Sequence, residues 1–213
     1  MKTFLIIGAG KFGHHLCKFL SAQNNEILLI DQDEEKLNDL LPFVTSARIA
    51  DCTKPEALSS FGVPNFDACF VCINEDFQAE LEITDLLNEL GAKQVIALAR
   101  TDIQAKFLIR NGADQVVYPD RDIADRISVS LSNDSIFDYI FLSDECSIFE
   151  IAAPRSWIGK TIGQINVRAK YNISIIAIKR DGKITSVPGI DYVFSANEHL
   201  MVMGTQQDVQ KIS

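Results

Sequence analysis

The sequence predicts an α/β fold in which a doubly wound parallel sheet is followed by a linking helix and a small C-terminal α+β domain. Through the first two thirds of the chain, short apolar runs alternate with segments whose apolar residues recur at helical spacing. From about residue 138 onward, β-type runs dominate instead. Alternating strands and helices are typical of a parallel sheet covered by helices on both faces. The change of pattern indicates a second, smaller domain.

The elements of the larger domain are expected where apolar runs and helix-period segments succeed one another. The strands are expected at residues 4–7, 27–30, 47–49, 68–73, 95–99 and 116–118. The helices are expected at residues 12–22, 33–41, 55–61, 77–90 and 103–111. In such a sheet a ligand lies at the carboxyl ends of the strands, near the switch in strand order.

The linking helix is expected at residues 120–131 and ends in the polar segment 132–135. We therefore expect one domain at residues 1–134 and a second at residues 135–213. The second should contain strands at 147–152, 173–178 and 200–203, and short helices near 162–167 and 206–212. The run Arg180-Asp181-Gly182-Lys183 predicts a hairpin turn. A domain of this size has a limited core, which favours pairing with a second copy.

One glycine-rich turn stands in the context that a nucleotide site requires. Gly8, Gly10 and Gly13 follow the first apolar run and open the first helix, and Asp31 closes the second apolar run. Gly8 permits a tight turn, Gly10 lets the backbone approach a phosphate, and Gly13 lets the helix pack against the strand. The helix N-terminus attracts phosphate, and an acid placed like Asp31 accepts ribose hydroxyls. This order of elements predicts a Rossmann-like nucleotide-binding domain.

Composition and charge limit the classes of protein to consider. Of the 213 residues 47% are hydrophobic and 23% charged, as in soluble globular proteins. No apolar run approaches the roughly 20 residues that span a bilayer, and no signal peptide is expected. The net charge of −9, with no basic stripe, argues against a nucleic-acid partner. We therefore expect a cytoplasmic protein with reduced thiols.

Cys69 and Cys72 have the C-x-x-C spacing of redox and metal motifs. They stand within an expected strand, where residues three apart point to opposite faces. No second cysteine pair completes a zinc site. We interpret both as buried structural residues.

Over its full length the chain resembles the KtrA/TrkA-type regulatory subunits of bacterial potassium uptake, which consist of RCK-domain TrkA-N and TrkA-C lobes. The resemblance is carried by residues 8–13, 30–34, 49–53, 111–114, 118–120, 142–145 and 166–170. It implies a homodimer that assembles into an octameric ring beneath a membrane-embedded, KtrB/TrkH-like potassium-translocating subunit, at the inner face of the cell membrane. It also implies that exchange of ATP for ADP changes the shape of the ring and gates ion flux.

The resemblance assigns roles to particular residues. The cofactor-binding residues that it implies are Gly8, Gly10, Lys11, Phe12, Gly13, Asp31, Gln32, Asp51, Cys52, Asn74 and Arg100. Thr53 should border the base, and Glu75 and Asp76 should lie on the same rim. In the TrkA-C lobe a cyclic di-AMP site would use Val167, Arg168, Ala169, Ile173, Ile175 and Pro188. A dimer interface without a ligand would explain those six residues equally well.

Two positions depart from the family pattern. Lys11 replaces an arginine common in the glycine loop, and a lysine cannot make arginine's bidentate contact with phosphate. Asp120 replaces a glutamate that helps to hold a divalent cation, Mg²⁺ or Ca²⁺, beside the phosphates. A solvent-exposed lysine and a helix N-cap are the simpler explanations of these two residues.

Three other functions are considered at this point. One is an NAD(H)-binding redox sensor of the TrkA type, because Asp31 suits the ribose of NAD(H) as well as that of ATP or ADP. Another is a ligand sensor without a channel partner. A small NAD-dependent oxidoreductase would need an acid or base such as histidine, or a tyrosine–lysine pair. None of the four tyrosines has a lysine four residues later. We therefore expect a binding and regulatory protein, not an enzyme.

Overall fold

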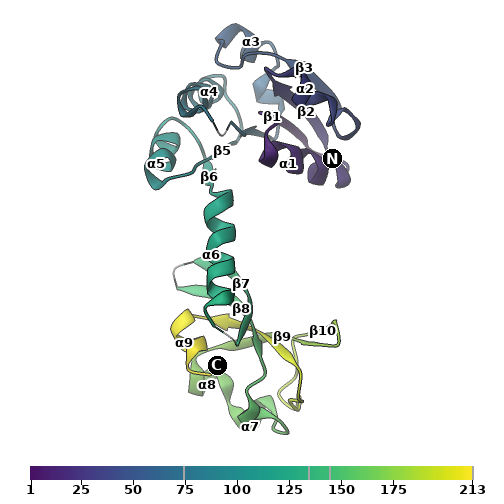
Figure 1. Cartoon of the computed structure of the whole chain (residues 1–213), viewed down its shortest axis with the longest axis vertical. Coiled ribbons are helices and arrows are strands. Elements are labelled where there is room, and N and C mark those ends of the chain that lie inside the picture. Colours follow the sequence, from purple (N-terminus) through teal and green to yellow (C-terminus); the bar gives the residue numbers. More distant parts are fainter. Residues whose placement is uncertain (74, 134, 144, 213) are drawn as a thin grey trace. The chain divides into compact units, whose positions relative to one another are not determined.

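The computed structural model describes residues 1–73, 75–133, 135–143 and 145–212. The chain forms two compact units, residues 1–121 and 122–213 (Figure 1). The division falls within helix α6 (Pro119–Leu131), so the linking helix expected at 120–131 is present and contributes to both units. Among the described residues, no helix is both long and apolar enough to cross a membrane.

The first unit contains a six-stranded sheet in the order β3-β2-β1-β4-β5-β6, with every pairing parallel. Its strands are β1 (Thr3–Ile7), β2 (Glu26–Asp31), β3 (Ser46–Ile49), β4 (Ala68–Val71), β5 (Val95–Leu98) and β6 (Gln115–Val117). Its helices before α6 are α1 (Lys11–Ala22), α2 (Glu34–Asn38), α3 (Pro55–Ser59), α4 (Phe77–Glu89) and α5 (Asp102–Arg110). The predicted doubly wound sheet is confirmed, and its strand order switches between β1 and β4.

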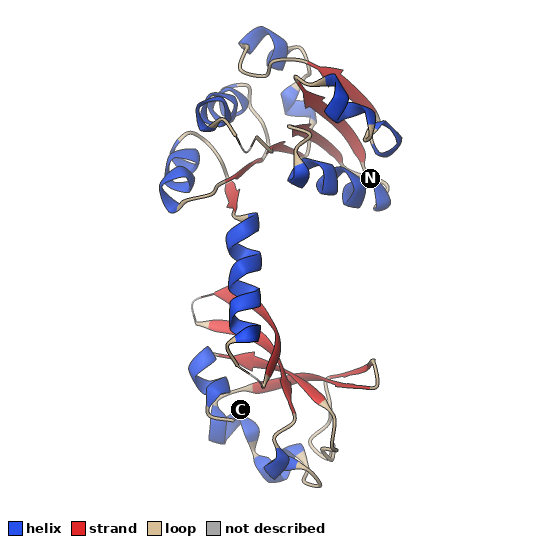
Figure 2. Cartoon of the chain, viewed as in Figure 1, coloured by secondary structure: helices blue, strands red, loops and turns tan. Residues whose placement is uncertain are grey.

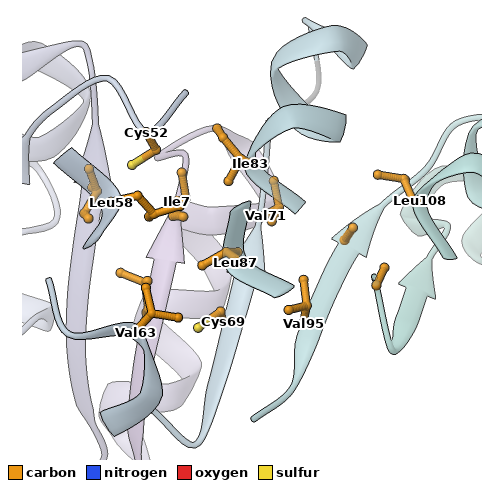
Figure 3. Packing of buried hydrophobic residues seen from close by; sticks show 14 of the residues in the cluster. Ile7, Cys52, Leu58, Val63, Cys69, Val71, Ile83, Leu87, Val95 and Leu108 are labelled. Carbon is orange, nitrogen blue, oxygen red and sulfur yellow. The ribbon is translucent and has the colours of Figure 1, made fainter. Parts of the chain in front are cut away.

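A hydrophobic core covers each face of this sheet. On one face α3, α4 and α5 pack through Leu58, Leu87 and Leu108, as Figure 3 shows. On the other face α1 and α2 pack against the sheet. Cys69 belongs to the first core and Cys72 to the second. The prediction that these two cysteines are buried on opposite faces is confirmed.

The second unit is built on a five-stranded antiparallel sheet in the order β10-β9-β11-β8-β7 (Figure 2). Its strands are β7 (Ile136–Ser143), β8 (Cys146–Ala152), β9 (Ser174–Arg180), β10 (Lys183–Ser186) and β11 (His199–Gly204). Its short helices are α7 (Ile162–Ile165), α8 (Val167–Tyr171) and α9 (Gln206–Gln210). Asp181 and Gly182 both have positive φ between β9 and β10, which confirms the predicted hairpin.

One residue of the first core is not apolar. Glu80 lies on the sheet-facing side of α4 with Ile83 and Leu87, and its side chain is 4% exposed. Its Oε1 atom has no hydrogen-bond partner among the described residues. Burial raises the pKa of this carboxyl to about 8. At neutral pH the folded chain therefore holds a proton that the unfolded chain releases.

We predict that Glu80 makes the chain less stable as pH rises. Below about pH 4.5 the carboxyl is protonated in both the folded and the unfolded state, and between that pH and about 8 only the folded state keeps the proton. The linked loss of unfolding free energy is on the order of 5 kcal/mol. Glu80→Gln should flatten this pH dependence in melting followed by circular dichroism, whereas Glu82→Gln, at an exposed site on the same helix, should not.

Candidate nucleotide site

A cavity of about 1270 Å³ lies at the carboxyl ends of the strands in the first unit. It extends from the end of β2 across the β1–α1 turn to the ends of β4 and β5. Figure 1 labels β1, β2, β5 and α1 of this set. The predicted site residues that line it are Gly8, Gly10, Lys11, Phe12, Asp31, Gln32, Cys52, Arg100 and Asp120. Glu75 and Asp76 also line it. Residues far apart in the sequence therefore meet at the edge of the sheet where a ligand is expected.

The remaining predicted residues lie elsewhere. Gly13 is buried inside α1. The side chain of Asp51 turns toward its own loop, where Asp51 Oδ1 accepts hydrogen bonds from the backbone N–H of Thr53 at 3.0 Å and from the Thr53 hydroxyl at 2.6 Å. Neither of these two residues lines the cavity, and Thr53, which is expected to border the base, does not line it either. Asn74 lies outside the described residues.

The N-terminus of α1 opens at the glycine turn. Gly10 is the N-cap residue and has no side chain to cap the helix, and the first turn holds no acidic residue. The first backbone N–H groups of the helix are therefore left for another acceptor. A Cβ atom on Gly10 would meet only the carbonyl oxygen of Cys72, at 3.8 Å, which is an ordinary contact. Packing within the protein does not require glycine here, whereas the close approach of a phosphate does.

Gly8 and Gly13, in contrast, are required by the packing of the protein itself. A Cβ atom on Gly13 would lie 2.1 Å from the carbonyl oxygen of Gly8. Gly8 has a φ of +104°, and a Cβ atom there would lie 2.6 Å from the carbonyl oxygen of Cys72. These two glycines allow α1 to begin directly above β1 and β4.

Asp31 fixes the glycine turn. Its Oδ2 accepts a hydrogen bond from the backbone N–H of Ala9 at 2.6 Å, and its Oδ1 accepts one from the backbone N–H of Asp33 at 2.9 Å. A carboxylate oxygen can accept more than one hydrogen bond, so both atoms keep acceptor capacity for a ribose hydroxyl. The sequence motif predicts the contact with ribose but not the contact with Ala9.

Gln32 and Cys52 form the cavity wall beside Asp31. Gln32 donates to Asp51 Oδ1 at 3.1 Å, and the hydrogen bonds from Thr53 hold the pKa of Asp51 below its usual range. Cys52 is 2% exposed, and burial raises the pKa of its thiol to about 12. This wall therefore presents a neutral thiol and an amide, which suit an uncharged base.

Lys11, Arg100 and Asp120 are exposed side chains on the rim of the same cavity. Within the described residues, no group of three or more histidine, cysteine or acidic side chains is arranged to hold a metal ion. Asp120 supplies one carboxylate. That donor set fits Mg²⁺, which keeps several waters and is bound by one or two carboxylates together with phosphate oxygens.

Three further residues of the cavity wall are not among the predicted ones. The outer face of α1 contributes His15, Leu16 and Phe19, which recur at helical spacing with the predicted Phe12. The rings of His15 and Phe19 are stacked, with centroids 6.3 Å apart. The signal in the sequence that could have identified them is this spacing.

In the second unit the six candidate residues do not share one surface. Val167 and Ile173 are buried in the core, and Ile175 packs against it. Arg168 and Ala169 are exposed on α8, and Pro188 is partly buried. The polar and small residues of the set are thus accessible, whereas two apolar ones stabilise the fold.

We predict that Gly10→Ala and Gly13→Ala separate ligand binding from folding. Gly10→Ala should cost about 1 kcal/mol or less in unfolding free energy, yet weaken nucleotide binding at least about tenfold, because the methyl group occupies the space of a phosphate. Gly13→Ala should cost about 3 kcal/mol or more because its methyl group overlaps the Gly8 carbonyl. Urea unfolding and calorimetric titration with ADP measure both effects. Unchanged ADP binding by Gly10→Ala would contradict the phosphate assignment.

Comparison with known proteins agrees with this architecture. Residues 4–119 match the TrkA-N domain family and residues 146–213 match the TrkA-C domain family. Ktr system potassium uptake proteins C and A of Bacillus subtilis (strain 168) are each 37% identical over 210 residues, which cover 99% of this chain and 95% of each relative. The structure of the GsuK channel bound to NAD superposes with a TM-score of 0.56 at 22% identity, over 100% of this chain and 38% of that one, and shows the same fold. The chain therefore belongs to the Ktr family of potassium uptake proteins, with one TrkA-N and one TrkA-C domain.

Proposed function

We propose that this chain is the nucleotide-responsive regulatory subunit of a potassium uptake system and that an adenine nucleotide in the cavity of the first unit controls ion flux. The observation that carries the proposal is the uncapped N-terminus of α1 at Gly10, which opens into the cavity beside Asp31. Membership of the Ktr family supplies the physiological context. The partner is a membrane-embedded potassium-translocating subunit of the KtrB/TrkH kind, at the inner face of the membrane, and the regulatory chains form dimers within an octameric ring.

The proposed mechanism is a population shift. A ligand moves an equilibrium between two shapes only if it binds one shape more tightly than the other. ATP and ADP differ in the terminal phosphate, so the residues that contact this phosphate must supply the difference. Lys11 and Asp120 lie on the cavity rim and carry opposite charges. Lys11 attracts the phosphate directly, and a divalent cation held between Asp120 and the phosphates would neutralise their charge.

NAD(H) is a second candidate ligand. The cavity reaches both sides of β1, from Asp31 to Arg100, which gives room for a second nucleotide moiety beyond the pyrophosphate. The GsuK channel, whose fold is similar, has been solved bound to NAD. In this alternative the chain is a redox-responsive subunit of the same kind of system. In neither case do we assign catalysis.

We further propose cyclic di-AMP as a ligand of a dimer of the second unit. Arg168 is exposed on α8 and suits a phosphate group, and Ala169 beside it leaves space for a purine. Val167 and Ile173 would support this surface from within the core.

We predict that Mg²⁺ strengthens the binding of ATP more than that of ADP and that Asp120→Asn removes this difference. The reason is that the cation needs both the Asp120 carboxylate and the phosphate oxygens. Calorimetric titrations of the whole protein with ATP, ADP and NADH, each with and without Mg²⁺, measure the effect. Binding of NADH without any response to ATP or ADP would contradict the ATP/ADP proposal and favour the redox alternative.

We predict that Arg168→Ala lowers the affinity for cyclic di-AMP at least about tenfold and leaves the dimer intact, because arginine–phosphate contacts are charge-assisted. Calorimetry measures the affinity, and light scattering measures the mass. Loss of the dimer instead would show that Arg168 belongs to a protein interface.

A further inference from the structure

Glu80 is a buried ionisable group of the first unit that the proposed function leaves without a role. It shares the inward face of α4 with Ile83, Thr84 and Leu87, all of which are buried. The hydroxyl of Thr84 donates to the backbone carbonyl of Glu80 at 2.7 Å and not to its carboxyl group. Burying a carboxylate with an unpartnered oxygen costs free energy, so an apolar residue would stabilise the helix better.

The surroundings of Glu80 come from two strand ends. Cys72 follows β4, and its thiol lies near enough to Glu80 that a negative charge on the carboxyl disfavours ionisation of the thiol. The backbone at Leu98, the last residue of β5, hydrogen-bonds the carboxyl, and the Arg100 guanidinium attracts it electrostatically. Burial outweighs both of these effects and holds the pKa of Glu80 at about 8.

Glu80 lies directly behind the wall of the nucleotide cavity. Ala79 and Ile83 of its own helix line the cavity, and so do Cys72 and Arg100. Glu80 itself is not a lining residue. The carboxyl is therefore buried next to residues that line the space a nucleotide would fill, and charges interact more strongly through a buried region than through water.

The other titratable groups near this wall are carboxylates and thiols. Glu75 and Asp76 precede α4 and line the cavity, with the Asp76 carboxylate accepting from the backbone N–H of Ala79 at 3.0 Å. Cys17 of α1 belongs to the same buried cluster as Cys72. Burial raises the pKa of both thiols so far that they stay neutral. Arg100 is the cation that acts on Glu80. A phosphate in the cavity competes for Arg100 and adds negative charge, and both effects favour the neutral acid.

We propose that Glu80 couples nucleotide binding to pH: in the pH range in which the empty site leaves Glu80 ionised, its carboxylate takes up a proton when an anionic nucleotide occupies the cavity, and this frees Arg100 to face the phosphates. The inference rests on the proposed nucleotide-binding function. One proton passes from solvent to the Glu80 carboxyl, and no bond of the nucleotide changes. Nucleotide affinity therefore falls as pH rises through the range in which the empty site loses this proton.

The test is calorimetric titration of the whole protein with ADP in EDTA, at pH 7.0, 8.5 and 9.5. At pH 8.5 the titration is repeated in two buffers of different ionisation enthalpy, so that the proton uptake is measured directly. The wild-type chain should take up a substantial fraction of a proton at pH 8.5. Its affinity for ADP should fall about tenfold between pH 7.0 and 9.5 if ADP raises the pKa of Glu80 by one unit.

Two variants identify the group. Glu80→Gln imitates the neutral acid, so its affinity should stay constant from pH 7.0 to 9.5 and its proton uptake should vanish. Glu82→Gln removes an exposed carboxyl from the same helix and should behave as wild type. If Glu80→Gln does not fold, Glu80→Leu, an apolar replacement of the kind that this buried position favours, takes its place with the same expected result.

The outcomes separate the inference from the function on which it rests. Tight ADP binding with equal affinity at all three pH values, or with proton uptake that persists in Glu80→Gln, overturns the role of Glu80 and leaves the nucleotide site standing. Absence of binding by ADP at pH 7.0, and likewise by NADH, overturns the proposed function and this inference with it.

Discussion

The close approach of three backbone segments at the β1–α1 turn is the constraint on which the first unit depends. The carbonyl oxygen of Gly8 occupies the space of a Gly13 side chain, and the carbonyl oxygen of Cys72 occupies that of Gly8. This contact brings the start of α1 to the switch point between β1 and β4, where the cavity opens. The hydrogen bond from Ala9 to Asp31 then ties the turn to β2. Binding capacity at the helix N-terminus thus follows from packing that the fold needs in any case.

The same geometry explains why the cavity combines polar and apolar walls. Strand ends supply backbone and carboxylate groups such as Asp31, whereas the helices that cover the sheet supply buried faces. Glu80 lies on the buried face of a covering helix, yet it carries a carboxyl group like those at the strand ends. A carboxyl in that place lowers stability at neutral pH, because the folded state must keep it protonated. Natural proteins accept local costs of this kind most readily near binding sites.

Sequence reasoning succeeds where a local pattern has one structural solution. Short apolar runs bounded by polar residues predict the six parallel strands, and Asp181-Gly182 predicts the hairpin because both residues tolerate positive φ. It fails where the outcome depends on distant partners. The periodicity of α4 indicates that position 80 faces the sheet. It does not reveal that one carboxyl oxygen of Glu80 lacks a hydrogen-bond partner among the described residues. β7 is not among the predicted strands, since its residues do not alternate between apolar and polar. The cyclic di-AMP site that the resemblance implies stays a prediction, and it groups the buried Val167 with the exposed Arg168.

Helix α6 is the covalent route by which the two units can influence one another. Pro119 and Asp120, at its start, line the nucleotide cavity. Further along, Arg126 holds Asp138 of β7 through two hydrogen bonds, at 2.7 and 2.6 Å, and the pair keeps the pKa of Asp138 low. A bidentate contact fixes orientation as well as distance. Asp120 in the first unit and Arg126 in the second therefore belong to one continuous helix. None of the described residues of α6 is fully buried, and Val129 packs against the core of the second unit, so Val129 and the Arg126–Asp138 pair are the contacts that attach the later turns of the helix to that unit.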